Sequence, residues 1–360
     1  MDRGAAGALG QPGSDVLRNL TVLRWDLDKT YLVSNFESLR GLLRIPFERA
    51  ADKRAVPGVV ALIKAVRRSA DQRGMETAVC FVSASPPQIG RAIREKLELD
   101  GIEYEEIRFK DQVHHLVRGH FDVLREQIGY KLAELTRSAS AAARRAEELL
   151  FGDDWESDPL IYSLYADLMA GNIGWEQLEP WLASAGVHAH YRDVIHRALQ
   201  ERRPPRYVRG IFILRARGRA ATELEAFGRR LLWFDNYFEC ALILHAIGYL
   251  RADGVVEVAL ASGLEIGELS ASFDSVASRW PWLRREHLTL ARTRLMKAGL
   301  VERVLPGGAG PRGLVWLRTR LGRPPLRLPQ ADAIPDYERV VSLWSHRGRK
   351  EARDVHGSEE

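Results

Sequence analysis

The sequence predicts an α/β fold in which helices cover both faces of a parallel β-sheet. Two observations support this: apolar runs of strand length recur along the first 250 residues, and amphipathic helical patterns separate them. Parallel strands buried on both faces read as continuous apolar runs, and helical crossovers must connect them. About five or six strands are expected. The runs that predict them are LTVLRWD, TAVCFVS, AEELLFGD, VRGIFILRA and RRLLWFDN.

Helical patterns fill the intervals between these runs. One helix is expected to begin near Val56–Val59, and another follows in PPQIGRAIREKLELDG. Lys131 is expected to open a third helix, and residues 165–200 read as further helices. In an open α/β sheet, ligands bind outside the carboxyl ends of the strands. Chemistry is therefore expected in the residues that directly follow each apolar run.

Composition excludes some classes of protein and leaves the partner open. The 360 residues are 46% hydrophobic and 28% charged, which suits a globular chain long enough for two domains. No apolar run approaches the roughly 20 residues that span a bilayer, and the first 15 residues lack the apolar core of a signal peptide, so a cytoplasmic protein is expected. The net charge of +5 is mild. Residues 284–320, however, hold nine basic and two acidic side chains and could meet an anion.

Carboxylates and hydroxyls follow three of the apolar runs. The first run leads into Asp26–Thr30, the second into Ser83–Pro87, and the third into Gly152–Asp158. Taken singly, an Asp or Ser after a strand only caps the next helix. Together they suit phosphoryl transfer, which needs a cation and a positioned nucleophile, and Mg²⁺ prefers carboxylate oxygens. Asp26 and Asp153 fit as its ligands.

The order of these motifs resembles the haloacid dehalogenase (HAD) superfamily, which implies a HAD-like Rossmannoid sheet and a Mg²⁺-dependent phosphatase. The resemblance implies that Asp26 is the nucleophile, forms an aspartyl-phosphate and binds the metal. Asp28 would act as general acid and base, with its backbone carbonyl at the metal.

The resemblance also implies roles for the other motif residues. Thr30, Ser83 and Lys131 would bind the phosphoryl oxygens. Asp153 would complete the metal shell. Asp158 or Asp154 would contact the metal or orient its ligands, and the sequence leaves open which of them does so.

Details around the motifs resemble the phosphatidate phosphatase catalytic domain of the actin-patch-protein type over about residues 20–250. The segment GDDWESDPLIYSLY carries the family pattern at Gly152, Asp153, Asp158, Pro159, Ile161 and Tyr162. This resemblance implies a phosphorylated small molecule or lipid phosphate as substrate, with transient contact to a membrane surface. The segment after Tyr31 is either an amphipathic flap for a lipid or ordinary packing on the sheet. The family usually has Asp where Lys29 stands; Lys29 either attracts an anion or is an exposed turn residue.

The carboxyl-terminal third shows longer helices, among them VEVALASGLEIGELSASFDSVASR, followed by a hairpin signal after Gly299. This order resembles a winged-helix module whose recognition helix would be Glu286–Lys297, with Arg312 in the wing. The alternative function is therefore a DNA-binding or protein-interaction regulator coupled to a HAD-like domain. The predicted divisions are a disordered head (1–18), the phosphatase domain (19–250), a helical or winged-helix domain (251–345) and a disordered tail (346–360).

Overall fold

The computed structural model describes residues 20–33, 53–85, 87–110, 120–141, 146–155, 157–201, 206–301 and 334–337. Within them the chain forms a six-stranded, wholly parallel sheet in the order β3-β2-β1-β4-β5-β6. The strands are β1 (Leu20–Asp26), β2 (Glu76–Ser83), β3 (Glu106–Phe109), β4 (Ala146–Asp153), β5 (Arg206–Leu214) and β6 (Leu231–Phe234). The predicted α/β fold with a Rossmannoid parallel sheet is confirmed.

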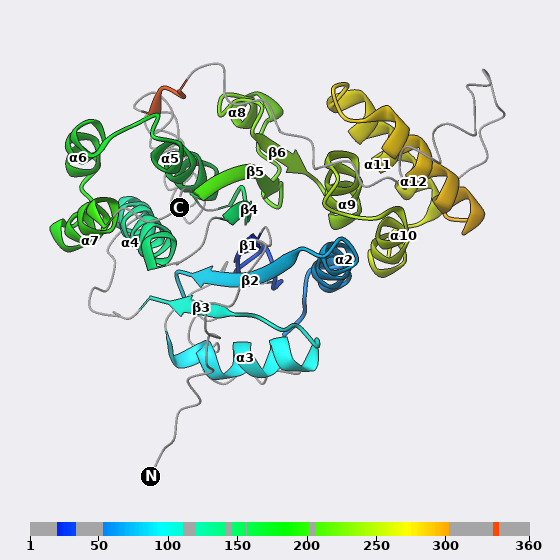
Figure 1. Ribbon diagram of the computed structural model, residues 1–360, viewed down its shortest axis with the longest axis horizontal. Helices are drawn as coiled ribbons and strands as arrows, with labels where there is room; N and C mark the ends of the chain where they lie inside the picture. The colour runs from blue at the N-terminus through cyan, green and yellow to red at the C-terminus, as the bar shows by residue number, and fades with distance from the viewer. Residues whose placement is uncertain are drawn as a thin grey trace, which may run out of the picture.

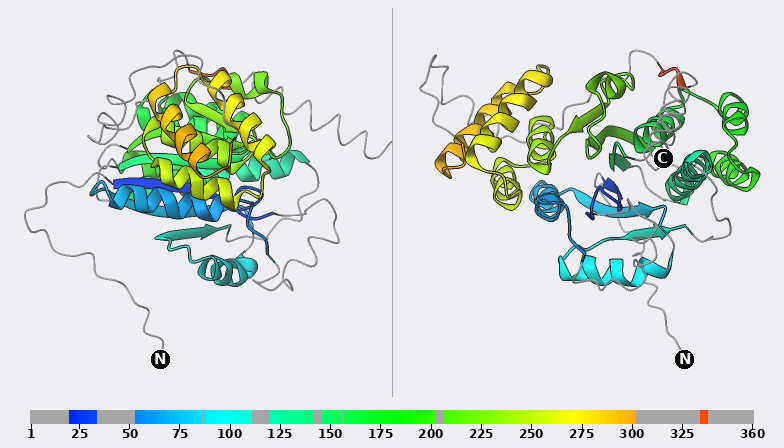
Figure 2. Two further views of the ribbon diagram at one scale, coloured as in Figure 1. Left: turned by 90° about the vertical axis from the view of Figure 1, so that its right-hand side faces the viewer. Right: turned by 180° about the vertical axis from the view of Figure 1, so that it is seen from behind.

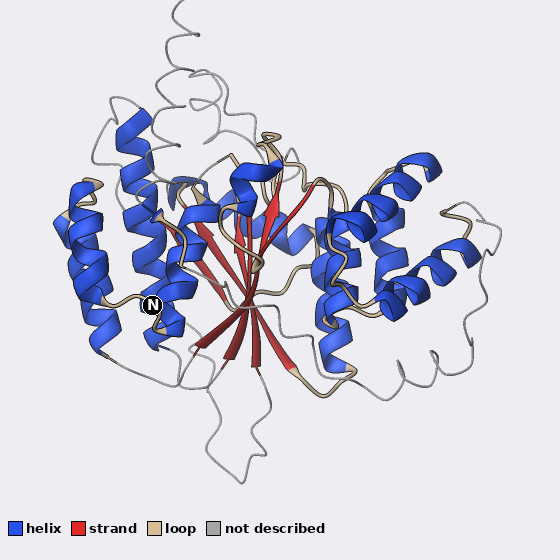
Figure 3. Cartoon of the chain, turned by 90° about the horizontal axis from the view of Figure 1, so that it is seen from above, coloured by secondary structure: helices blue, strands red, loops and turns tan. Residues whose placement is uncertain are grey.

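Helices cover both faces of the sheet (Figure 1). On one side lie α4 (His120–Ala141) and α5 (Asp158–Ala170), with α6 (Trp175–Ser184) and α7 (Ala189–Gln200) outside them. On the other lie α2 (Val59–Asp71) and α9 (Tyr237–Ile247), with α10 (Ala252–Ala261), α11 (Ile266–Arg279) and α12 (Arg285–Lys297) beyond. Near the sheet's two ends are α3 (Gly90–Leu99), which follows the short turn η3 (Pro87–Ile89), and α8 (Ala221–Glu225). Seen from above, the strands fan out between the two groups of helices (Figure 3).

The strand order places the chemistry between β1 and β4. From β1 the chain runs outward through β2 and β3, then returns to pair β4 with the other side of β1. At such a reversal the connections leave in opposite directions and open a crevice at the carboxyl ends of the strands. Asp26 ends β1 and Asp153 ends β4, so the topology brings both to this crevice.

The two faces of the central strands bury different chemistry. On the α9 face, the rings of Trp25 and Phe151 stack with centroids 3.9 Å apart, and Phe151 stacks on Phe212 at 4.9 Å. On the α5 face, Arg24 forms a buried ion pair with Glu148 at 3.1 Å. Burying a charge pair stabilises a fold only when further hydrogen bonds satisfy it. Here the hydroxyl of Tyr165 donates to Glu148 at 2.6 Å.

Three local expectations were wrong. Lys131 does not open its helix but lies inside α4, which begins at His120. The segment 252–279 is two helices, because the chain turns at Gly263, whose φ of +70° favours glycine. The sixth strand, β3, lies at Glu106–Phe109, within a segment interpreted as helix and turn. Its four residues are half-buried at the sheet edge and alternate between charged and apolar side chains, so they lack the continuous apolar run of the inner strands.

The C-terminal helices share their core with the sheet domain. The apolar residues of α10, α11 and α12 belong to the same buried cluster as those of the strands. A Cβ added at Gly254 of α10 would lie only 3.0 Å from Cβ of Ala65 in α2, so these two helices cross at close range. Figure 2 shows the helices of residues 252–297 packed beside α2 and α9. Arg312 and almost all of the hairpin predicted after Gly299 lie outside the described residues, as do the whole predicted head (1–18) and tail (346–360).

Candidate active site

The turn after β1 presents two carboxylates in five residues. Asp26 is 1% exposed and Asp28 is 8% exposed. The chain turns back sharply here, because the amides of Tyr31 and Leu32 both donate to the carbonyl of Leu27. Lys29, in the middle of the turn, has a φ of +59°, the one positive φ of a non-glycine residue among the residues described. This conformation is uncommon for a residue with a side chain.

The phenol of Tyr237 in α9 is hydrogen-bonded to this turn. Its hydroxyl donates to the carbonyl of Thr30 at 2.6 Å. Burial raises the pKa of Tyr237 well above its usual value, and the nearby carboxylates of Asp153 and Asp26 act in the same direction. The phenol therefore stays protonated and remains a donor. The turn is thus attached to helix α9 as well as to its own strand, β1.

The end of β4 supplies two more buried carboxylates. Asp153 ends the strand, and Asp158 begins α5, where its Oδ2 accepts from the amide of Asp153 at 3.3 Å. Asp153 itself accepts from the Trp155 amide at 2.7 Å and from the Thr30 hydroxyl at 3.1 Å. Gly152 makes this packing possible, since a Cβ there would lie 2.6 Å from Cβ of Asp158.

Lys131 joins the two strand ends. From α4 its Nζ lies 2.8 Å from Oδ1 of Asp26 and 2.7 Å from Oδ1 of Asp158. The lysine side chain is 1% exposed, so its charge is matched inside the protein. Asp26, Asp153 and Asp158 offer carboxylate oxygens that lie within 4.8 Å of one another.

This donor set fits a divalent cation. Asp26, Asp153 and Asp158 are buried carboxylates whose oxygens converge, and Lys131 contacts two of them. Hard divalent cations prefer carboxylate oxygens. A buried acidic triad that could hold a metal ion is therefore present, and its oxygens already lie close together without any movement of the backbone.

Asp28 faces a second group of residues, at the end of β2. Its Oδ2 accepts hydrogen bonds from the hydroxyl of Ser83 at 3.1 Å and from that of Ser85 at 2.6 Å. The amide of Ser85 donates in turn to Ser83 Oγ at 3.1 Å. The contact with Ser85 was missed from the sequence, although a hydroxyl two residues after a predicted site serine was a usable signal.

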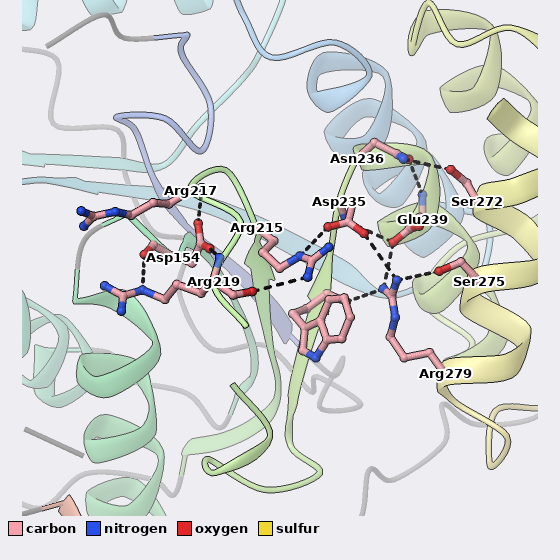
Figure 4. A network of polar contacts seen from close by, with 11 residues as sticks. Asp154, Arg215, Arg217, Arg219, Asp235, Asn236, Glu239, Ser272, Ser275 and Arg279 are labelled. Atoms are coloured by element: carbon pink, nitrogen blue, oxygen red, sulfur yellow. Dashed lines mark hydrogen bonds and ion pairs between the residues drawn. The ribbon is translucent and has the colours of Figure 1, made fainter. Parts of the chain in front are cut away.

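The loop after β5 also reaches this edge of the sheet. The carboxylate of Asp154 accepts from the amides of Arg217 at 2.6 Å and Arg219 at 2.7 Å (Figure 4). The guanidinium of Arg219 donates to the Asp154 carbonyl at 2.6 Å. Asp154 thus fastens a loop, whereas Asp158 lies within the acidic triad. Sequence reasoning missed this loop, although its residues directly follow the VRGIFIL run.

The sequence-predicted site residues come together in the structure. Asp26, Asp153, Asp158 and Lys131 form one buried group, Thr30 contacts Asp153, and Ser83 contacts Asp28. Their chemical roles remain predictions.

Part of the chain is similar to a known protein family. Residues 25–174 match the model of the family described as phosphatidate phosphatase APP1, catalytic domain. The recognition made from the motifs is confirmed for these residues, which form a phosphatidate phosphatase-like domain. The matched region begins at the last two residues of β1, includes β2, β3, β4 and every predicted site residue, and ends before β5. No curated protein and no solved structure matched the chain.

Proposed function

We propose that the chain, whose residues 25–174 match a phosphatidate phosphatase catalytic domain, is a Mg²⁺-dependent phosphomonoester hydrolase of the HAD type. Asp26 is its nucleophile and phosphatidate its first candidate substrate. The observation that supports this most is the pairing of Lys131 with both Asp26 and Asp158 beside Asp153. One cation and several carboxylates at the carboxyl edge of a parallel sheet suit phosphoryl transfer.

In the proposed first step, Asp26 attacks phosphorus. A bond forms between its carboxylate oxygen and phosphorus, the ester P–O bond breaks, and Asp28 gives its proton to the departing alcohol oxygen. Lys131, 2.8 Å from the Asp26 carboxylate, stabilises the negative charge of the phosphoryl oxygens as they approach.

In the second step, Asp28 takes a proton from water. The water oxygen bonds to phosphorus, the bond to Asp26 breaks, and inorganic phosphate leaves. Ser83 and Ser85, which donate to Asp28, hold its carboxylate in one orientation for both transfers. Ser83 and Thr30 are further candidates to donate to the phosphoryl oxygens.

Asp26, Asp153 and Asp158 would hold the metal, with the Asp28 backbone carbonyl as a further ligand. When bound, Mg²⁺ would neutralise charge on the transferring phosphoryl group. The residues described include no helix long and apolar enough to cross a membrane, so we propose that a lipid substrate is reached through contact with the membrane surface. The amphipathic segment after Tyr31 that was suggested for this contact lies mostly outside the described residues.

The nucleic-acid alternative gains no support from the described part of the C-terminal helices. On α12, Arg292 lies 3.6 Å from the carboxylate of Asp274, and Arg294 lies 3.6 Å from that of Asp253. Two basic residues of the helix that was expected to contact DNA therefore lie close to acidic groups of neighbouring helices. DNA binding would require an affinity that falls steeply with salt concentration.

The test is hydrolysis of phosphatidate in neutral detergent micelles, glucose 6-phosphate and AMP, each with and without Mg²⁺. Asp26→Asn should lower kcat by about 10⁴-fold or more, because an amide is a poor nucleophile. Asp28→Asn should accumulate phosphorylated protein, because release of phosphate lacks its base. Asp71→Asn, an exposed carboxylate on α2, is the matched control. Wild-type rates in both site variants would refute the mechanism.

A further inference from the structure

A chain of buried hydrogen bonds connects α9 to both strand ends of the acidic site. The hydroxyl of Tyr237 donates to the carbonyl of Thr30 at 2.6 Å, and the hydroxyl of Thr30 donates to Oδ2 of Asp153 at 3.1 Å. All three residues are fully buried. Tyr237 is therefore connected to the turn that carries Asp26 and Asp28 and, through Thr30, to the end of β4.

The ring of Tyr237 is closely packed on several sides. Its centroid lies 5.3 Å from that of Phe234 and 6.0 Å from that of Trp25. A Cβ added at Gly58, at the start of α2, would lie 3.1 Å from Cβ of Tyr237. Every residue of α9 is buried. The ring therefore has little freedom to turn away from the Thr30 carbonyl.

The start of α9 is itself fastened to a later helix. The side chain of Asn236 accepts from the amide of Glu239 at 3.0 Å and donates to the hydroxyl of Ser272 in α11 at 3.0 Å (Figure 4). Such a cap fixes the first turn of a helix, where Tyr237 lies. Both α9 and α11 follow residues 25–174, the segment that matches the family model. The turn is thus supported by a part of the chain that the match does not cover.

The β1 turn needs support from its surroundings. Lys29 has a φ of +59°, a conformation that costs free energy and persists only where neighbouring contacts offset the cost. The amides of Tyr31 and Leu32 close the turn by donating to the carbonyl of Leu27. Without the phenol hydroxyl, the buried Thr30 carbonyl loses a donor, which favours a shift of the turn toward another donor. Such a shift would displace both carboxylates that the turn carries.

We propose that Tyr237 is a positioning residue, whose hydroxyl holds the β1 turn so that Asp26 and Asp28 keep the geometry that phosphoryl transfer needs. This inference rests on the proposed function and extends the catalytic unit beyond the matched residues. A displacement of about 1 Å can lower a rate about 100-fold. Because Tyr237 acts through the backbone of Thr30, its loss should lower kcat more than it changes KM.

The primary test is amide hydrogen exchange of the full chain, which does not depend on turnover. In the wild type, the amides of Tyr31 and Leu32 should be protected; exchange at the rate of an unstructured peptide would overturn the inference without any variant. Tyr237→Phe keeps the ring and removes only the hydroxyl. The peptide that contains both amides should then exchange about tenfold faster, and the interior of β4 should not change.

The second test is kinetic and uses whichever of phosphatidate, glucose 6-phosphate and AMP the wild type hydrolyses with Mg²⁺. Well below the Tm of each variant, Tyr237→Phe should lower kcat about 10–100-fold and keep KM within about twofold. Tyr249→Phe is the matched control. Tyr249 is 2% exposed, and its hydroxyl donates to Glu147 at 2.9 Å, near the amino end of β4. This variant loses a buried hydrogen bond at the opposite edge of the sheet and should change neither the turn nor kcat.

Unchanged exchange of the turn, or an unchanged kcat in an active enzyme, would overturn the inference for Tyr237→Phe. Equal effects in Tyr249→Phe would also overturn it, because they would reflect lost stability alone. A wild type that hydrolyses none of the three substrates, with exchange that rises only in Tyr237→Phe, would support the hold on the turn and refute the proposed function. The two failures are therefore distinguishable.

Discussion

Gly152→Ala is expected to damage the acidic site through packing alone. The added Cβ would lie 2.6 Å from Cβ and 2.8 Å from Cγ of Asp158, whereas non-bonded carbon atoms prefer about 3.5–4.0 Å. The end of β4 and the start of α5 must therefore separate by about 1 Å. Overpacking of this kind costs about 1–3 kcal/mol, which corresponds to a fall in Tm of about 2–12 °C.

The same displacement should weaken metal binding. Asp158 is a proposed ligand and accepts from the Asp153 amide at 3.3 Å, so moving it disturbs two members of the triad. Loss of a supporting contact typically lowers metal affinity about 10–100-fold. The assay is thermal unfolding at increasing Mg²⁺ concentration, which yields the stability and the apparent Kd together.

Gly267→Ala is the matched control for this variant. Gly267 lies in α11 with no atom within 4 Å of an added Cβ, so alanine should stabilise the helix by about 0.5–1 kcal/mol. If Gly152→Ala matched this control in both Tm and Mg²⁺ affinity, the packing argument for the site would be wrong.

Three further predictions concern the stability of the fold and change the buried residues Lys131, His245 and Tyr337. Lys131→Met should lower the free energy of unfolding by about 3–5 kcal/mol in Mg²⁺-free buffer, because two buried carboxylates lose their cation. Denaturant unfolding should show that Mg²⁺ restores part of this stability. Equal losses with and without Mg²⁺ would contradict a shared cation site. Burial lowers the pKa of His245 to about 4. The neutral imidazole should therefore contribute about 3 kcal/mol to the free energy of unfolding above pH 6.5, and this contribution should be lost as the pH falls to about 4. His245→Gln should therefore flatten the dependence of unfolding free energy on pH over that window, and an unchanged slope would refute it. Tyr337→Phe removes a hydrogen bond to the buried carboxylate of Asp167 and should cost about 1.5–3 kcal/mol, measured as a lower denaturant midpoint at constant slope.

The acidic motifs were predictable because sheet topology acts on local sequence. A carboxylate after an apolar run lies at the carboxyl edge of a parallel sheet wherever its strand sits, so the apolar runs alone assign Asp26 and Asp153 to that edge. The strand order then makes them neighbours across the β1–β4 reversal. The family match over residues 25–174 covers the same motifs.

Two helix boundaries were misplaced. The start of α4 was placed about ten residues too late, although Phe121, Leu124 and Ile128 recur at helical spacing before Lys131 and were a usable signal. The two helices of residues 252–279 were merged because the chain's break is a single left-handed glycine.

The sequence by itself determined that this chain forms a parallel α/β sheet with carboxylates at the carboxyl edge. Burial on both faces requires apolar strands, and the proposed phosphoryl transfer requires acidic turns. The tertiary structure decided which side chains meet. Lys131 reaches Asp26 and Asp158 from a distant helix, and Arg217 reaches the Trp155 ring from the loop after β5. Such pairs arise when separate strands and helices converge, and the distance between two residues along the chain carries no record of that convergence.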